Sequence, residues 1–148
     1  MGREISLTEA TAIIKDCRDA GLVTQPATSQ NPTGMCNCCG DCCGVLKALN
    51  KHPKPAEMVF SNHLAKVDGD ECTGCEQCLE RCQMDAIFMN DDELAQVSPE
   101  RCIGCGLCVT TCPVEAITLV PKPETALRLP PANTAEQMFL MAQKRGIL

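Results

Sequence analysis

The sequence predicts a mixed α+β fold in which a duplicated metal-binding unit lies between a helical N-terminal part and a C-terminal helix. Three observations support this prediction. A run of four cysteines occurs twice, the copies starting at residues 72 and 102. Helix-start signals occur on both sides of these runs. The chain has 148 residues but only three Phe, with no Trp or Tyr, so we expect metal–thiolate bonds to supply much of the folding free energy.

The two cysteine runs share the spacing C-x-x-C-x-x-C-x-x-x-C. This spacing is typical of chains that bind two 4Fe-4S clusters, in which the fourth cysteine of each run ligates the other cluster. The sequence therefore predicts one cluster on Cys72, Cys75, Cys78 and Cys112, and a second cluster on Cys102, Cys105, Cys108 and Cys82. The alternative is a double zinc site, although zinc usually takes two short cysteine pairs separated by a longer loop.

The repeat extends beyond the cysteines, because Gly74 matches Gly104 and Ala86-Ile87 matches Ala116-Ile117. We interpret the region as one duplicated unit. The two glycines are expected to permit a sharp turn and to bring backbone N–H groups close to the cluster sulfurs. Four apolar residues are expected to cover the clusters: Leu79, Ile87, Val109 and Ile117.

With these motifs, and with Cys112-Pro113 closing the second run, residues 64–121 resemble the bacterial dicluster ferredoxin family. The resemblance implies two β-hairpins and two short helices related by a pseudo-two-fold axis, and it implies electron transfer as the activity. Gln83 departs from the family pattern, which has proline after this cysteine. The departure frees a backbone N–H near the second cluster.

Five further cysteines crowd into eight residues: Cys36, Cys38, Cys39, Cys42 and Cys43. Adjacent cysteines cannot all bury their thiols on one side of a short segment, so metal binding explains them better than packing. Four or more of them are predicted to hold a third iron–sulfur cluster. Zinc and redox-active or disulfide-forming thiols are the alternatives. The spacing does not determine which four would ligate.

Three parts are predicted along the chain: a helical Cys-rich metal-binding module over 1–60, a dicluster ferredoxin-like domain over 61–121, and a Pro-rich arm with a C-terminal helix over 122–148.

Local signals place the elements of the first and last parts. Ser6 predicts the cap of a helix over 7–20, followed by a loop over 22–34 and a short helix from 43 to about 50. Asn133 predicts the cap of a last helix that ends near Lys144. The apolar side of this last helix is expected either to pack on the N-terminal module or to dock on another subunit.

Charge is distributed unevenly along the chain. Residues 68–124 carry twelve Asp or Glu against three Lys or Arg, a formal −9, whereas the remainder carries seven against ten, a formal +3. An acidic surface attracts basic docking surfaces on a redox donor and acceptor, although it can also serve solubility alone. The same balance disfavours nucleic-acid binding.

Several function classes lack support in the sequence. There is no signal-peptide pattern, and no apolar run of about eighteen residues that would span a membrane. We therefore expect a cytoplasmic protein with reduced thiols. No nucleophile–base pair, phosphate-binding loop or dinucleotide motif is present, so catalysis by this chain alone is not predicted.

The whole chain also resembles the C-terminal part of larger iron–sulfur proteins of anaerobes, in which a helix, a Cys-rich patch and a dicluster ferredoxin follow in this order. Asp41 stands where that pattern commonly has another cysteine. The resemblance implies a subunit or partner of a larger redox complex, or a fragment of a longer protein. The predicted function is electron transfer. The alternatives are an enzyme subunit whose N-terminal cluster contacts substrate, and a structural or regulatory zinc module fused to a ferredoxin.

Overall fold

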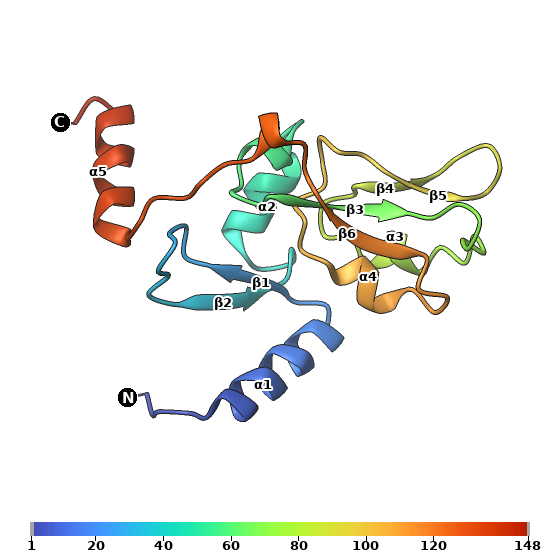
Figure 1. Cartoon of the computed structure of the whole chain (residues 1–148), viewed down its shortest axis with the longest axis horizontal. Helices are drawn as coiled ribbons and strands as arrows, with labels where there is room; N and C mark the ends of the chain where they lie inside the picture. Colours follow the sequence, from blue (N-terminus) through green and yellow to red (C-terminus); the bar gives the residue numbers. More distant parts are fainter. Residues whose placement is uncertain (1, 148) are drawn as a thin grey trace.

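The N-terminal part of the chain combines two helices with a two-stranded hairpin, in a computed structural model that describes residues 2–147 (Figure 1). Its elements in chain order are α1 (Leu7–Asp19), β1 (Val23–Pro26), β2 (Met35–Cys38) and α2 (Gly44–Lys51). The Ser6 hydroxyl accepts a hydrogen bond from the Glu9 N–H at 3.2 Å, which caps α1 as predicted. Cys43 is the N-cap of α2.

The prediction of a loop over 22–34 is wrong at its N-terminal end, because residues 23–26 form β1, whereas β2 begins just after the predicted loop. Strands β1 and β2 pair in antiparallel register, with Val23 opposite Cys38 and Pro26 opposite Met35. Each strand has only four residues, and Val23 is the one side chain of the pair that is buried. So short and polar a ribbon lacks the alternation of apolar residues that predicts a strand. Its cysteines nevertheless lie on and just after a strand.

The second part has the two small sheets and two short helices of the expected unit (Figure 1). Strand β3 (His63–Val67) pairs antiparallel with β6 (Ile117–Pro121), and β4 (Ile87–Met89) pairs with β5 (Ala95–Val97). The β4–β5 ribbon is a hairpin, whereas β3 and β6 are the first and last strands of the unit. Helices α3 (Gln77–Arg81) and α4 (Leu107–Thr111) each begin inside a cysteine run. The mixed α+β class is confirmed.

The duplication is visible in the backbone as well as in the sequence. Three pairs of residues with positive φ recur at a separation of thirty positions: Gly74 and Gly104, Glu76 and Gly106, Asp85 and Glu115. At Gly74 a Cβ atom would meet the carbonyl oxygen of Glu93, and at Gly104 it would meet that of His63. These glycines therefore permit a close approach to a neighbouring segment of the protein, in addition to the turn.

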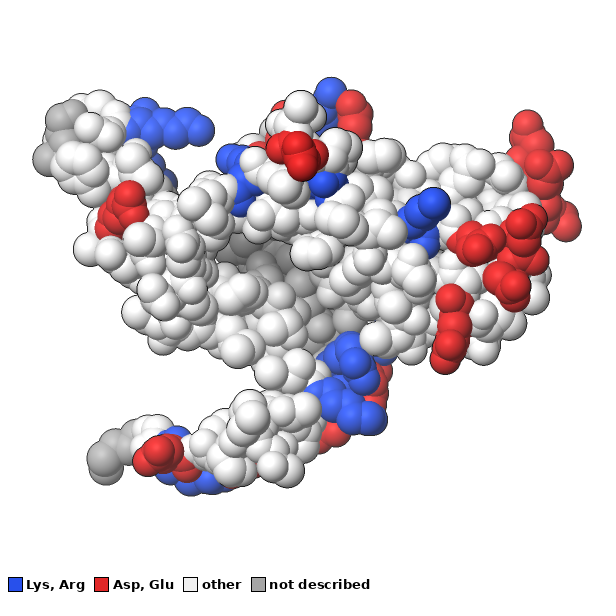
Figure 2. Space-filling model, viewed as in Figure 1, with Lys and Arg blue, Asp and Glu red and all other residues white. Residues whose placement is uncertain are grey.

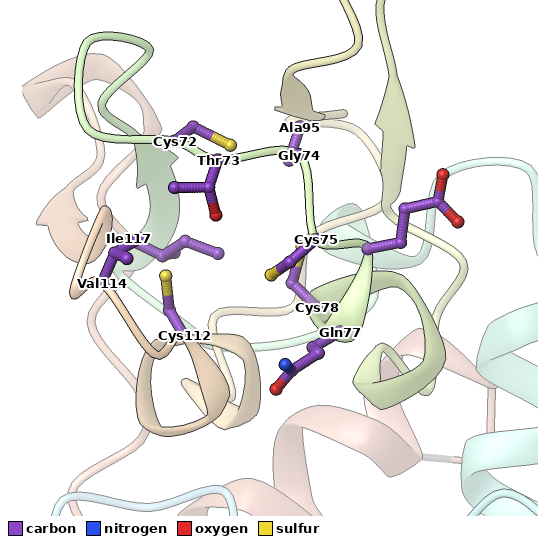
Figure 3. Close-up of a pocket in the computed structure, with 11 residues that line it drawn as sticks. Cys72, Thr73, Gly74, Cys75, Gln77, Cys78, Ala95, Cys112, Val114 and Ile117 are labelled. Atoms are coloured by element: carbon purple, nitrogen blue, oxygen red, sulfur yellow. The ribbon is translucent and has the colours of Figure 1, made fainter.

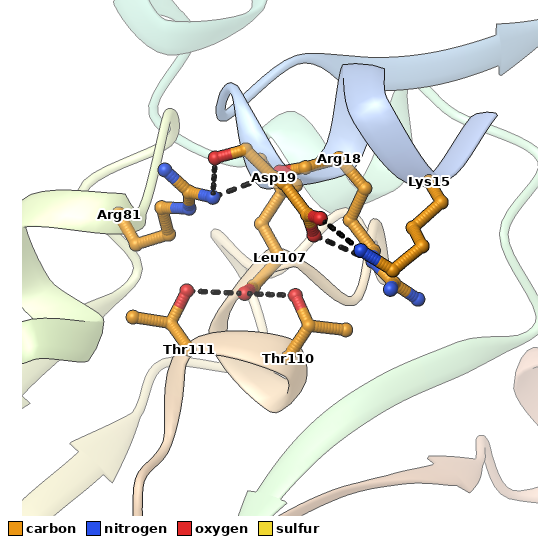
Figure 4. Close-up of polar contacts among 7 residues, drawn as sticks. All are labelled: Lys15, Arg18, Asp19, Arg81, Leu107, Thr110 and Thr111. Atoms are coloured by element: carbon orange, nitrogen blue, oxygen red, sulfur yellow. Dashed lines mark hydrogen bonds and ion pairs between the residues drawn. The ribbon is translucent and has the colours of Figure 1, made fainter. Parts of the chain in front are cut away.

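One apolar cluster joins the N-terminal part to the ferredoxin-like unit. Val23 and Leu46 belong to the same buried cluster as Met84 and Leu107. Arg81 adds polar contacts, because its guanidinium donates to the carbonyl oxygens of Arg18 at 2.8 Å and Asp19 at 2.6 Å (Figure 4). These carbonyls belong to the last turn of α1, where a cation is favourable.

The C-terminal arm returns to the tip of the N-terminal hairpin. The Gln30 N–H donates to the Pro131 carbonyl oxygen at 2.8 Å. Helix α5 (Thr134–Lys144) follows, capped by Asn133 as predicted, because the Asn133 side-chain oxygen accepts from the Glu136 N–H at 3.0 Å. No residue of α5 is buried, and Phe139 is 52 % exposed. The arm, and not the apolar side of α5, therefore packs on the N-terminal module.

Candidate metal centres

The first cavity takes three cysteines from one run and the fourth from the other. Its lining includes Cys72, Cys75, Cys78 and Cys112, around a space that is partly open to solvent. Figure 3 shows the sulfur atoms of Cys72, Cys75 and Cys112 facing this space. Cys72 and Cys75 come from the loop before α3, whereas Cys112 is the C-cap of α4. Residues far apart in sequence are thus brought to one site.

The second cavity repeats this arrangement with the roles of the runs exchanged. Cys102, Cys105, Cys108 and Cys82 line a second space that is also partly open to solvent. Two backbone groups donate to its sulfur atoms: the Ala65 N–H to Cys102 at 3.4 Å and the Ala86 N–H to Cys82 at 3.3 Å. The site therefore provides donors for negatively charged sulfur.

Apolar side chains close both cavities, as expected, but they are only partly the predicted ones. Ile117 lines the first cavity and Ile87 lines the second. Leu79 and Val109 pack against the apolar core instead. Each follows a cysteine by one position on a short helix, and successive helical side chains point about 100° apart. Met84, Ile103 and Leu107, which no motif in the sequence indicates, also line the second cavity.

Burial makes three of the thiols in these cavities weaker acids. It raises the pKa of Cys108 to about 12 and also raises the pKa of Cys78 and Cys105. Several thiolates in an apolar cavity are unfavourable unless a bound cation balances them. Four sulfur donors around an apolar space, with backbone N–H groups aimed at sulfur in the second cavity, fit an iron–sulfur cluster.

The five N-terminal cysteines lie on what we call the Cys-rich hairpin, residues 23–43. Cys36 and Cys38 are on β2, Cys39 and Cys42 flank the following turn, and Cys43 starts α2. The sulfur atoms of Cys39 and Cys42 lie 3.9 Å apart. The structure therefore brings this group together, although only Cys36 and Cys38 share a strand.

Cys43 has surroundings that favour a negatively charged sulfur. Its pKa is lowered, chiefly by the backbone N–H of Leu46 in the first turn of α2, whereas hydrogen bonding to Cys36 is the main cause that raises the pKa of Cys38 to about 11. The Gln25 side-chain nitrogen is buried with no oxygen or nitrogen partner, and it contributes to lowering the Cys43 pKa. A buried donor of this kind suits a thiolate or a cluster sulfur.

No three His, Cys, Asp or Glu side chains between residues 2 and 147 converge closely enough to hold a single metal ion.

Gln83 connects the Cys-rich hairpin to the second cavity, whose lining it joins. Its side-chain oxygen accepts from the Gly40 N–H at 2.8 Å, and its side-chain nitrogen donates to the Gly21 carbonyl oxygen at 3.1 Å. The sequence indicates only that the absence of proline at this position frees a backbone N–H. In the structure, the Gln83 side chain in addition forms two hydrogen bonds that proline could not form.

Acidic residues gather at the end of the molecule that carries the turn between β4 and β5 (Figure 2). The exposed ones in the two neighbouring loops are Asp68, Asp70, Glu71, Glu76, Asp91, Asp92 and Glu93. Glu76 also lines the first cavity. This acidic surface is therefore next to the first cavity.

Between residues 2 and 147, no helix has the length and apolar character needed to cross a membrane. A search of curated proteins finds no significant match to the chain. Residues 65–119 match the family described as 4Fe-4S dicluster domain, and this range contains both cavities' cysteines. Together with the cavities, the match identifies residues 65–119 as an iron–sulfur domain of the dicluster ferredoxin type, which supports an electron-transfer role.

Proposed function

We propose that this protein transfers electrons through two 4Fe-4S clusters, one held by Cys72, Cys75, Cys78 and Cys112 and the other by Cys82, Cys102, Cys105 and Cys108. The composition of the two cavities is the observation that supports the proposal, because each combines three cysteines of one run with the fourth of the other. Crossed ligation of this kind characterises the two-cluster arrangement, and two independent zinc sites do not require it.

The surrounding residues tune and insulate the two sites. Apolar side chains such as Ile87 and Ile117 exclude water, and in the second cavity backbone N–H groups donate to sulfur. When bound, a 4Fe-4S cluster accepts and releases an electron at a potential set by hydrogen bonds to its sulfurs and by solvent exposure. Cys75 and Cys105 are exposed, so one edge of each cavity faces the surface, where a redox partner can approach.

We further propose a third iron–sulfur cluster on the Cys-rich hairpin, with at least four of its five cysteines as ligands. The lowered pKa of Cys43 and the buried, unpartnered amide of Gln25 support a site for anionic sulfur. Zinc is the main alternative at this site.

The proposed partners are a redox donor and acceptor with basic docking surfaces, within or alongside a larger redox complex. The acidic surface next to the first cavity supports this choice, because opposite charges accelerate encounter. All fourteen cysteines are free thiols, which supports a reducing compartment such as the cytoplasm.

The test is the content of iron, sulfide and zinc per chain in protein purified without oxygen, together with EPR and Mössbauer spectra. About twelve iron atoms and no zinc would support all three clusters. About eight iron atoms with one zinc would keep the electron-transfer role and make the hairpin a zinc site. Zinc in place of iron in both cavities would overturn the proposal.

Crossed ligation has a separate test. Cys112→Ser should alter the EPR signal that Cys75→Ser alters, and should leave the signal that Cys105→Ser alters unchanged. Cys17→Ser, the same substitution on α1, should change neither signal. If Cys112→Ser changes the signal that Cys105→Ser alters, each run holds its own cluster and the assignment fails.

A further inference from the structure

Gln83 contacts the Cys-rich hairpin at Gly40 and the chain just before the hairpin at Gly21. Gly21 precedes β1, and Gly40 follows β2 between Cys39 and Cys42. The Gln83 amide bonds to the backbone of both glycines, at 3.1 Å and 2.8 Å. Because Gln83 directly follows Cys82 and lines the second cavity, one residue spans from the hairpin cysteines to that cavity.

The contact at Gly40 is close and depends on the absence of a side chain there. A Cβ atom at residue 40 would lie 2.9 Å from the Gln83 side-chain oxygen. Any larger residue would force the two groups apart. A displacement of the turn between Cys39 and Cys42 therefore reaches Gln83 directly.

The first cavity has no comparable connection. Across residues 2–147, no hydrogen bond joins the Cys-rich hairpin to a residue that lines the first cavity. The residue equivalent to Gln83 in the second run is Pro113, which has no side-chain donor or acceptor. The two halves of the repeat therefore differ at the position that would connect them to the hairpin.

We infer that the state of the Cys-rich hairpin sets the reduction potential of the cluster in the second cavity, and not that of the first, through Gln83 as a positioning residue. The inference rests on the proposed electron-transfer function. Potentials of iron–sulfur clusters depend on nearby hydrogen bonds and solvent exposure, both of which change at the second cavity when Gln83 moves. The coupling is reciprocal: reduction of the cluster in the second cavity changes the affinity of the Cys-rich hairpin for its metal by the same factor by which metal binding changes the reduction equilibrium constant.

The test compares the midpoint potentials of both clusters in the full-length holoprotein before and after a change at the hairpin. Cys39→Ser with Cys42→Ser alters the two residues that flank Gly40 and Asp41. We expect about a tenfold change in the reduction equilibrium constant of the second cluster, or ~59 mV for a one-electron couple, and less than about twofold for the first.

The same pair of substitutions is then made in a Gln83→Leu background, where the second-cluster change should be lost. Gln83→Glu keeps an acceptor for the Gly40 N–H and should keep the change, which also guards against a misfolded Gln83→Leu variant. Gln96→Leu is the matched control, because Gln96 is exposed on β5 and away from the hairpin. Cys75→Ser and Cys105→Ser assign the two signals.

Three results would overturn the inference: equal changes at both clusters, the same change with and without Gln83, or no change at either cluster. Metal content of each sample distinguishes these from failure of the proposed function. If about eight iron atoms are retained in the cavities, the result concerns the inference alone. If the unaltered protein does not bind them, the proposed function and the inference both fail.

Discussion

Cys43 is the residue of the Cys-rich hairpin whose ligand role is most open to test. Its pKa is lowered at the start of α2, so it supplies a thiolate more readily than Cys38 and Cys42, whose pKa values are raised. Cys43→Ser replaces this thiolate with a hydroxyl that stays protonated. We expect the hairpin to lose its metal, so that about four iron atoms per chain disappear while about eight remain. Metal analysis of the anaerobic protein measures this loss.

Cys17→Ser is the matched control for this variant. Cys17 lies half-buried on α1, outside the Cys-rich hairpin, and its substitution should leave the metal content unchanged. Full metal retention in Cys43→Ser would show that the other four hairpin cysteines are sufficient.

The sequence predicts which cysteines lie together, but it does not predict the contacts of the glutamine side chains. The grouping of the eight cavity cysteines follows from spacing, because a cluster needs thiolates at a fixed reach. Gln25 faces Cys43 only because β1 pairs with β2, and Gln83 reaches Gly40 only because the hairpin packs on the unit. Glutamine in a sequence signals neither contact.

At the scale of the element, helices α3 and α4 have N-cap residues at equivalent positions of the repeat, but the backbone strain at these two residues differs. The N-cap of each has positive φ, at 60° for Glu76 and 78° for Gly106. A residue with a Cβ atom pays roughly 1–2 kcal/mol in this conformation. Glu76→Gly should therefore stabilise the protein, by about 1 kcal/mol or less after the entropic cost of glycine. Gly106→Ala should destabilise it by about 1–2 kcal/mol.

The anaerobic denaturant midpoint, followed by visible absorbance, measures both changes. Glu80→Gly is the control, because Glu80 is exposed inside α3 and glycine there should destabilise by about 1 kcal/mol. Destabilisation by Glu76→Gly equal to that by Glu80→Gly would show that positive φ at residue 76 carries no strain.

Elements with capping signals were predicted well, and the short ribbon was not. Ser6 and Asn133 place the starts of α1 and α5 correctly because each cap bonds an N–H three residues ahead. The β1–β2 pairing depends on contacts across the hairpin and on the buried Val23, which joins the core of another part of the chain. A pattern within four residues cannot show such a contact.

At the scale of the whole molecule, the apolar core is small and depends on the cavities. Leu46 and Met84 are its largest fully buried apolar side chains apart from proline, and several core members are cysteines. Removing iron with a chelator under reducing conditions should therefore unfold the ferredoxin-like unit. The metal–thiolate bonds that stabilise the fold are lost, and the buried sulfur atoms are left without a metal. Far-ultraviolet circular dichroism and amide exchange over 63–121 measure the loss.

Restoring iron and sulfide is the control for this experiment, and it should return both signals. Native-like amide protection of β3 and β6 in the iron-free protein would contradict the prediction. In that case the sheet pairing and the apolar cluster would suffice for folding.

The molecule is also polarised, with the acidic surface next to the first cavity and the Cys-rich hairpin next to the second. If a partner docks at the acidic end, neutralising the 91–93 loop should slow electron transfer. We expect Asp91→Asn, Asp92→Asn and Glu93→Gln together to lower the second-order rate constant of electron transfer to a basic c-type cytochrome roughly tenfold at low salt. Stopped-flow absorbance measures the rate, and the difference should vanish near 1 M salt, where the screening length is about 3 Å.

Asp16→Asn with Glu4→Gln is the control, because it removes charge from the N-terminal end of the chain instead. This variant should leave the rate nearly unchanged. Equal slowing by both sets of substitutions would mean that net charge, and not the acidic surface beside the first cavity, governs the encounter.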